Sequence, residues 1–540
     1  AGRGAWSAAL HDRAVACLAR RRAALAGTVE ALPMAPDEQA LVDRLPAPET
    51  CGDAAYLTAG VAPPDPLQAS EANELDTIVS RARNEIVTAR VDDARQALDA
   101  VQNRIDALGY APLAARARFV RALGLHTVGD LGAAFNELRE TYFAARAAGD
   151  FETAAEAASD AALVLLDLSR DPEASDWARI ATAEATAAAV SGSVRVALRA
   201  TVAVDKQRGE LGKALEAADR LVAMEKADTR TGVLAMALNE RGRVLSAMGE
   251  EQRAIADFDG AIAEFHARHG EFSQPLAGAY GDRSISHSHL HRYAEAEADA
   301  REALRIAERV DGKNGEMRGV ALSALGVALQ GQSKLDEALA TLDRSLALAR
   351  ATEGSDYNVA SDLNNRADLL ARMGRLDDAI ASWEECIELW TKVLGPNGQE
   401  VAIAWINVAN ALISVRDEEH AEEPAHKALA ILAAIGKDAP AFLVAEGKIE
   451  VGVVLVKKAD WKGAREALEA GLALMDPKTG DPIWRARAEK GLGTVELRTG
   501  DAAKGRELLQ SARAVYVSSP ENTDVIGEID ALLSDRSHMP

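Results

Sequence analysis

Apolar residues follow the period of an α-helix in two short segments between residues 363 and 386. The first segment has its apolar residues on one face and ends at a glycine: Leu363, Ala367, Leu370 and Gly374. The second segment repeats a buried face at i, i+4 and i+7: Ala379, Trp383 and Cys386. The pattern predicts a helical hairpin whose small residues let the two helices approach closely. Such a hairpin cannot bury its apolar face alone, so we expect neighbours on both sides.

The small residue that opens the buried face of the second helix recurs along most of the chain. Its equivalents are Ala94, Ala134, Ala214, Ala254, Ala296, Ala338, Ala421, Ala464 and Gly505. From Ala214 onward the steps lie between 40 and 43 residues, and the 80 residues after Ala134 leave room for one irregular repeat. A larger residue such as Phe258, Leu342 or Leu468 usually follows four positions later. This phase, with aromatic residues at only 4%, predicts an all-α array of hairpins.

Two further positions recur with the same phase. A small residue in the first helix is found at Gly242, Ser284, Gly326, Ala367 and Ala409, and a turn glycine at Gly249, Gly374 and Gly500. The pattern resembles the tetratricopeptide repeat, in the longer form of about 42 residues that kinesin light chains use. Their linker is matched by Leu394-Gly395-Pro396-Asn397, whereas His291, Ser333 and Arg416 replace the turn glycine. The resemblance implies a right-handed α-solenoid with an N-terminal helical cap.

This interpretation predicts four parts of the chain. They are an N-terminal cap segment at 1–59, a Pro-rich linker at 60–70, a superhelix of about eleven hairpins at 71–516, and a C-terminal capping helix and tail at 517–540. Within the cap, one helix is expected from Ala8 to Leu32. Its inward residues are predicted to be Leu10, Cys17, Leu18 and Leu25, with Arg20, Arg21 and Arg22 outward.

The N-terminal segment has a second resemblance. The sequences AVACLARRRAAL (14–25) and LPAPETCGDAAYL (45–57), followed by residues 109–155, resemble the C-terminal part of large bacterial serine/threonine kinases of the eukaryotic-like type. No glycine-rich loop, VAIK lysine, HRD or DFG motif occurs in the chain, so the resemblance implies a kinase domain upstream and outside it. The location would be cytoplasmic, or extracytoplasmic if a membrane helix precedes this part.

Three cysteines occur, and two of them match cysteines of that kinase family. For Cys17 and Cys51 two interpretations stay open: a pair of reduced buried thiols, or a disulfide that clips the cap and places it outside the cytoplasm. Cys386 lies on a predicted buried face and is most simply a small core residue.

The charge of the chain narrows the classes of partner. With 61 basic and 84 acidic residues the formal net charge is −23, which disfavours nucleic acid and anionic membrane surfaces. The charge serves solubility in one interpretation and a preference for basic peptides in the other. No run of 18 apolar residues occurs, so we expect no membrane insertion within this chain.

The sequence offers little chemistry for catalysis. His287 and His291 have an i, i+4 spacing that zinc can use, but His287 falls at a core position and no HExxH motif is formed. Repeat packing is the preferred interpretation and a metal-dependent enzyme the less favoured one. We therefore predict no cofactor, no bound metal and no enzymatic activity for this chain.

Polar residues on the first helices predict a peptide-binding groove. The candidates are Asn239, Arg243, Ser246, His289, Asn364, Asp368, Arg372, Asn407, Asn410 and Ser414. Asparagine suits this role because its amide offers both a donor and an acceptor to a peptide unit. Alternatively these side chains are solvated or pair between repeats. The predicted function is protein or peptide binding, as the sensor or docking half of a kinase or as a free-standing scaffold; the oligomeric state is not predicted.

Overall fold

The computed structural model is helical throughout the part of the chain that it describes. That part comprises residues 7–34, 41–42, 45–46, 48–88, 90–168, 170–188, 190–227, 234–310, 315–352, 356–415, 417–436, 439–475, 481–517 and 523–534. No β-strand occurs in these residues. The chain divides into two compact units, Ala1–Lys313 and Asn314–Pro540, and each is described by itself.

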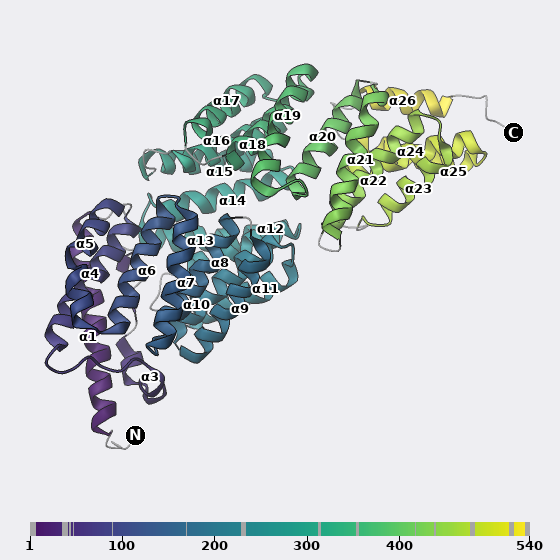
Figure 1. The fold of residues 1–540 in the computed structure, drawn as a ribbon. Coiled ribbons are helices and arrows are strands. Elements are labelled where there is room, and N and C mark those ends of the chain that lie inside the picture. Colours follow the sequence, from purple (N-terminus) through teal and green to yellow (C-terminus); the bar gives the residue numbers. More distant parts are fainter. Residues whose placement is uncertain are drawn as a thin grey trace. The chain divides into compact units, whose positions relative to one another are not determined.

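The first unit starts with a helical segment that precedes the repeats. This segment contains α1 (Ala8–Ala31), the 3₁₀ turns η1 (Leu32–Met34) and η2 (Pro48–Gly52), and α3 (Ala54–Ala59). Six hairpins follow within the described residues (Figure 1). They are α4 (Ala69–Val87) with α5 (Val91–Leu108), α6 (Ala111–Thr127) with α7 (Leu131–Ala147), α8 (Phe151–Asp167) with α9 (Asp171–Ala188), α10 (Ser191–Gln207) with α11 (Leu211–Ala227), α12 (Leu234–Ala247) with α13 (Glu251–His269), and α14 (Gln274–His289) with α15 (Tyr293–Val310).

The second unit contains five hairpins in its described residues, followed by a final helix. The hairpins are α16 (Glu316–Gly331) with α17 (Leu335–Ala351), α18 (Asp356–Arg372) with α19 (Leu376–Leu394), α20 (Gln399–Ser414) with α21 (Glu418–Ile435), α22 (Ala441–Lys457) with α23 (Trp461–Leu472), and α24 (Pro482–Thr499) with α25 (Ala502–Tyr516). The final helix is α26 (Thr523–Ser534), which packs on α25 through apolar side chains.

The repeated small residue of the first helix lies directly against the repeated larger residue of the second. A Cβ atom built on Gly242 would lie 2.6 Å from the ring of Phe258, and one on Gly326 would lie 2.5 Å from Leu342. Gly452 stands in the same relation to Leu468, at 2.5 Å. The small residue is therefore a steric requirement of close helix packing, because a side chain there would displace the buried neighbour. This contact explains why the fold is an α-solenoid of hairpins with a regular phase.

In the hairpins whose turn residue the structure describes, that residue has a positive φ. The glycines predicted for this position have positive φ, 76° at Gly249 and 75° at Gly374. His291 and Ser333, which replace glycine, hold the same conformation with φ of 56° and 59°, and so does Ala459 with 59°. The turn geometry is thus kept where glycine is missing, at about 1 kcal/mol or more for each residue. Arg416 lies outside the described residues.

The predicted orientation of the N-terminal helix is wrong for three side chains. Leu18 and Leu25 are 50% and 49% exposed, whereas Arg21 points inward and pairs with Glu152 at 3.2 Å. The reason is the close packing of α1 on α4: a Cβ on Gly27 would lie 2.6 Å from the backbone nitrogen of Arg81. Small residues must face such a neighbour, and the buried side of α1 accordingly consists of Ala14, Cys17, Ala23, Gly27, Thr28 and Ala31. The leucines are left on the solvent side.

Candidate functional site

The predicted binding residues all lie on first helices. Among the described helices of each unit, the first helices of neighbouring hairpins contact one another, as α12 does α14 and α18 does α20. Neighbouring second helices approach each other less closely. A ligand that crosses from one hairpin to the next along the first helices would therefore meet side chains from adjacent repeats.

In the first unit, the predicted polar residues form hydrogen bonds with two acidic side chains. Asp282 of α14 accepts hydrogen bonds from Asn239 Nδ2 at 3.0 Å and from Arg243 Nε at 2.6 Å, both on α12. Asn239 Oδ1 is buried and has no hydrogen-bond partner among the described residues. Asn239 and Arg243 therefore pair between repeats, as the alternative interpretation of the sequence proposes.

The second acidic side chain is Glu251, the first residue of α13. It accepts a hydrogen bond from Ser246 Oγ at 2.9 Å, and its other carboxylate oxygen lies 2.6 Å from His289 Nδ1. Ser286 also donates to Ser246, at 3.3 Å. These side chains likewise fasten α12, α13 and α14 to one another.

In the second unit, Asn364 is the centre of the predicted group. Its Oδ1 atom accepts from the indole Nε1 of Trp383 at 3.2 Å and from Nδ2 of Asn407 at 3.0 Å. Asn410, one turn further along α20, has no hydrogen-bond partner among the described residues and is partly exposed. The side-chain carbonyl oxygen of Asn364 is thus used in two hydrogen bonds within the fold, whereas the Asn410 amide has no partner among the described residues.

The remaining three candidates contact the preceding first helix or their own helix. Asp368 accepts a hydrogen bond from Gln330 of the preceding first helix and lies 3.3 Å from Arg372. Ser414 donates to the backbone carbonyl of Ala411 at 2.6 Å, so its hydroxyl proton is used inside its own helix.

Three of the bonds between first helices follow one rule, and we call these three bonds the inter-hairpin row. In each pair, a residue three positions before the small residue of one first helix meets a residue two positions before the small residue of the next. The pairs are Asn239 with Asp282, Ser323 with Asn365 (3.1 Å), and Asn364 with Asn407. The row places polar side chains at a fixed register on the first helices of both units.

Sequence reasoning missed a second set of repeated contacts, made by arginines one position before the small residue. Arg241 bonds to Asp257 of its own hairpin at 2.7 Å and to Asp219 of the preceding one at 2.9 Å. Arg283 bonds to Asp299 at 2.8 Å and Asp259 at 2.6 Å, and Arg366 to Ser382 at 3.0 Å and Asp343 at 2.7 Å. The detectable signal was the phase: each arginine has its hairpin partner 16 residues later. These contacts join neighbouring hairpins, and they occupy the guanidinium groups of the three arginines.

The histidines do not form a metal site in the described residues. His287 is buried, and its Nε2 atom lies 3.7 Å from Asp299; burial lowers the pKa of His287 and so favours its neutral form. His291 is exposed at the turn and lies 2.8 Å from the hydroxyl of Tyr293. Across the described ranges, no group of three or more His, Cys, Asp or Glu side chains could hold a metal ion.

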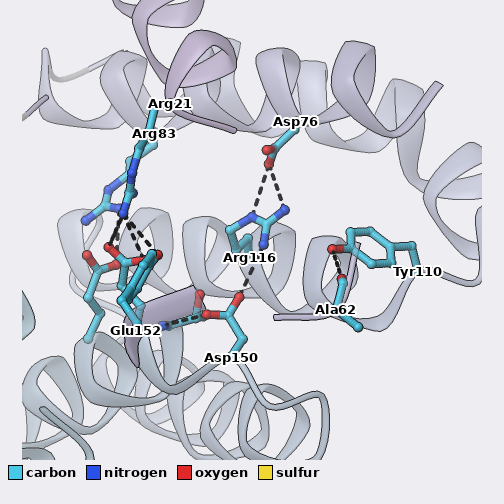
Figure 2. A network of polar contacts seen from close by, with 11 residues as sticks. Arg21, Ala62, Asp76, Arg83, Tyr110, Arg116, Asp150 and Glu152 are labelled. Carbon is cyan, nitrogen blue, oxygen red and sulfur yellow. Dashed lines mark hydrogen bonds and ion pairs between the residues drawn. The ribbon is translucent and has the colours of Figure 1, made fainter. Parts of the chain in front are cut away.

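A polar network fastens the N-terminal segment to the repeats (Figure 2). Glu152 at the start of α8 accepts from Arg21 of α1 and from the hydroxyl of Tyr56 in α3, each at 3.2 Å. Burial, together with the charge of Glu152, raises the pKa of Tyr56 to about 12. Arg116 of α6 bridges Asp76 at 3.0 Å and Asp150 at 3.2 Å. The segment is thus an integral part of the first unit.

Cys17 and Cys51 are joined by a disulfide in this segment. Their Cα atoms lie 5.6 Å apart, and both side chains are buried with Tyr56 and Leu57. The bond links α1 to η2 across 34 residues. It therefore holds Tyr56, in the helix that follows η2, close to Arg21 and Glu152.

Comparisons with known proteins agree with the repeat pattern. The tetratricopeptide repeat model matches residues 275–351 and 358–434. Protein KINESIN LIGHT CHAIN-RELATED 1 of Arabidopsis thaliana is 26% identical over 137 residues, which make up 25% of this chain and 22% of that relative. The chain therefore spans less than a quarter of that relative's length.

Solved structures give more distant likenesses. BtubC (BKLC) from P. vanneervenii is 20% identical, with 42% of this chain and 90% of that one covered and a TM-score of 0.36. Rap protein, solved in complex with Competence and Sporulation Factor, is 13% identical over 71% of this chain and 97% of that one, with a TM-score of 0.47. None of the described helices is long and apolar enough to cross a membrane. Residues 275–351 and 358–434 are therefore tetratricopeptide repeats, in a chain that has kinesin light chain-like relatives.

Proposed function

We propose that the chain is a non-catalytic scaffold that binds a protein or peptide along its first helices. The observation that supports this best is the set of amides on α18 and α20. Trp383 and Asn407 both donate to Asn364 Oδ1, and this leaves the Asn364 amino group and the Asn407 carbonyl oxygen without partners among the described residues. With Asn410, the face offers donors and acceptors to a peptide backbone. Because the internal bonds orient the amides beforehand, binding costs little side-chain entropy.

A direct experiment selects ligands on the intact chain. Random 12-residue peptides displayed on phage would be selected on the immobilised protein, and the enriched peptides would be measured by fluorescence anisotropy. Asn410→Ala removes one hydrogen bond of about 0.5–1.5 kcal/mol, so we expect binding to weaken about two- to tenfold. The matched control is Gln510→Ala, which removes an exposed amide on the second helix α25. If the selected peptides bind the Asn410 variant as tightly as the wild type, the proposed face is wrong.

We further propose that the chain is the sensor or docking half of a bacterial serine/threonine kinase. The support is the ordered resemblance of residues 14–25, 45–57 and 109–155 to that family. A disulfide between Cys17 and Cys51 would persist in an oxidising compartment, which fits an extracytoplasmic position. The gene sequence upstream of residue 1 tests this: a kinase domain followed by a membrane helix is expected. A reading frame that starts near residue 1 would favour the free-standing scaffold instead.

The predicted division of the chain belongs to the same proposal. We assign the cap to 1–59, the linker to 60–70, the repeats to 71–516 and the capping helix with its tail to 517–540. The support is that α4 begins at Ala69, within two residues of the proposed end of the linker, and that α26 spans Thr523–Ser534. Limited proteolysis followed by mass spectrometry should cut first between these parts, and cleavage inside the hairpins instead would contradict the division.

A further inference from the structure

The solvent-facing side of α1 is apolar. Val15, Leu18, Leu25 and Val29 are between 49% and 56% exposed, although each is a large aliphatic side chain. None of the other described helices has more than one exposed large apolar side chain. The opposite side of α1 packs on α4, which lies beside it (Figure 1). The four side chains therefore form an exposed apolar stripe, which we call the α1 stripe.

The spacing of the α1 stripe is that of a seam between two helices. Val15 and Leu18 are three residues apart, Leu18 and Leu25 seven, and Leu25 and Val29 four. These are the a and d positions of a heptad, which pack against a second helix. Arg22 occupies the one position of the series that is not apolar. A single charged residue at such a position lowers the stability of the helix pair but specifies its register.

The last helix of the described residues does not have such a stripe. The exposed residues of α26 are Asp524, Gly527, Asp530, Ala531 and Ser534. Its apolar side is turned inward, with Ile529 fully buried. A polar outer face is what keeps the end of a repeat array soluble. The α1 stripe is therefore not a general feature of the helices that flank these repeats, and an exposed apolar surface of this kind marks an interaction site.

Two charges at the α1 stripe are complementary to each other. Arg22 lies within the stripe and Asp12 at its edge, and both are exposed. Neither has a hydrogen-bond or ion-pair partner among the described residues, whereas Glu30, on the same edge, lies 3.3 Å from Arg81. Asp12 and Arg22 are ten residues apart, about 15 Å along the helix axis, and cannot pair within one helix.

An antiparallel pair of α1 helices brings these charges together. If the twofold axis passes near residue 17, midway between the two charged residues, Arg22 of each copy faces Asp12 of the other. A twofold interface repeats every contact, so both arginines and both aspartates are paired. Leu18 lies next to the axis and packs against Leu18 of the second copy. A second copy thus supplies both an apolar surface for the stripe and a carboxylate for Arg22.

We propose that α1 is a dimerisation helix and that the α1 stripes of two copies pack against each other in antiparallel orientation. This inference goes beyond peptide binding and does not depend on it. Because α1 has 24 residues, the seam is about 36 Å long. One helix pair forms a small interface, so we expect a dissociation constant on the order of 10 μM or weaker.

Sedimentation equilibrium of the full chain tests the proposal, at concentrations from about 1 to about 200 μM, which bracket this affinity. We expect a monomer–dimer equilibrium for the wild type. Leu18→Glu/Leu25→Glu places charges in the seam and should weaken association at least about tenfold. The matched control is Val320→Glu on α16, because Val320 is 48% exposed, and it should associate like the wild type.

Exchanging the two charges tests the orientation. Arg22→Glu sets a glutamate against Asp12 of the second copy and should weaken the dimer about three- to tenfold. The double variant Asp12→Arg/Arg22→Glu restores opposite charges and should recover the wild-type affinity. Circular dichroism melting at a concentration where the chain is monomeric shows whether each variant still folds.

Two results would overturn the dimer: a wild type that stays monomeric over the whole range, or equal association of the wild type and Leu18→Glu/Leu25→Glu. The α1 stripe would then be covered by another part of this chain or by a different protein. A double charge variant that associates no better than Arg22→Glu would overturn the antiparallel pairing.

Discussion

Replacing Asn364 by alanine should destabilise the second unit although the residue lies on the candidate binding face. The substitution removes the acceptor of Trp383 Nε1, whose side chain is 1% exposed, and also the acceptor of Asn407. A buried indole donor left without a partner costs about 1–3 kcal/mol, and the lost bond from Asn407 adds about 1 kcal/mol. We therefore expect a loss of about 2–4 kcal/mol. Asn410→Ala, which breaks no internal bond, should change stability by less than about 0.5 kcal/mol.

Urea unfolding followed by tryptophan fluorescence measures this difference. The second unit contains Trp383, Trp390, Trp405, Trp461 and Trp484, so the signal reports mainly on it. Asn364→Asp is the informative control, because it keeps an oxygen acceptor for the indole and should recover most of the stability. If Asn364→Ala unfolds at the same urea concentration as Asn410→Ala, the hydrogen bonds assigned to Asn364 do not stabilise the protein, and the reasoning is refuted.

Three further predictions follow from single positions. Because the pKa of Glu446 is raised from 4.5 to about 8, the folded protein holds this proton more tightly than the unfolded chain, and stability is lost as pH rises between those values. At about 1.4 kcal/mol per pH unit the loss of stability is at most about 5 kcal/mol, and the partial exposure of Glu446 reduces it to about 1–3 kcal/mol. Glu446→Gln should therefore be more stable than the wild type near pH 8.5 and similar to it near pH 4. If urea unfolding gives the same difference in stability between the two proteins at both pH values, this prediction is contradicted. Gly27→Ala should lower the free energy of unfolding by about 1–3 kcal/mol, because its Cβ would meet the backbone of α4. Leu18→Ser should change the free energy of unfolding by less than about 0.5 kcal/mol, because Leu18 is exposed. If both variants shift the melting temperature equally, the packing described for α1 is wrong. Ala459→Gly should raise stability by up to about 1 kcal/mol, since it relieves a φ of 59°, while Ala464→Gly in the following helix should lower it; a loss in both would show that the turn is not left-handed.

The regular part of the fold was predictable because it repeats. In several hairpins a small residue of the first helix lies under a larger residue of the second, and this steric demand marks the sequence at a regular spacing, as with Gly326 and Leu342. The turns followed from the same phase, and His291 and Ser333 keep the geometry that glycine holds elsewhere. The orientation of α1 was not predictable, because the helix occurs once. Its buried side is set by Gly27 and by α4, which lies about 50 residues away.

The helices that carry the candidate residues were predictable, but the contacts of those residues were not. All of the proposed residues lie on first helices, yet a sequence does not distinguish a polar side chain that faces solvent from one that bonds to the next repeat. Asn364 and Asn410 illustrate this: the first is fixed by Trp383 and Asn407, and the second has no partner among the described residues. The arginines before the small residue escaped notice for the same reason, because an arginine on a helix ordinarily indicates a solvated face.

If the chain binds a peptide along its first helices, as proposed, the inter-hairpin row bears on where that peptide can bind. Where the row is complete, as between Asn239 and Asp282, the polar groups of neighbouring first helices satisfy one another, and a ligand would have to break these bonds before forming its own. On this proposal, the groups open to a peptide are the polar groups that the row does not use. Asn410 is one of them, because it lies one turn beyond the row on α20 and has no hydrogen-bond partner among the described residues. The proposal therefore expects specificity to come from polar groups outside the row, since the positions within the row already hold the hairpins together.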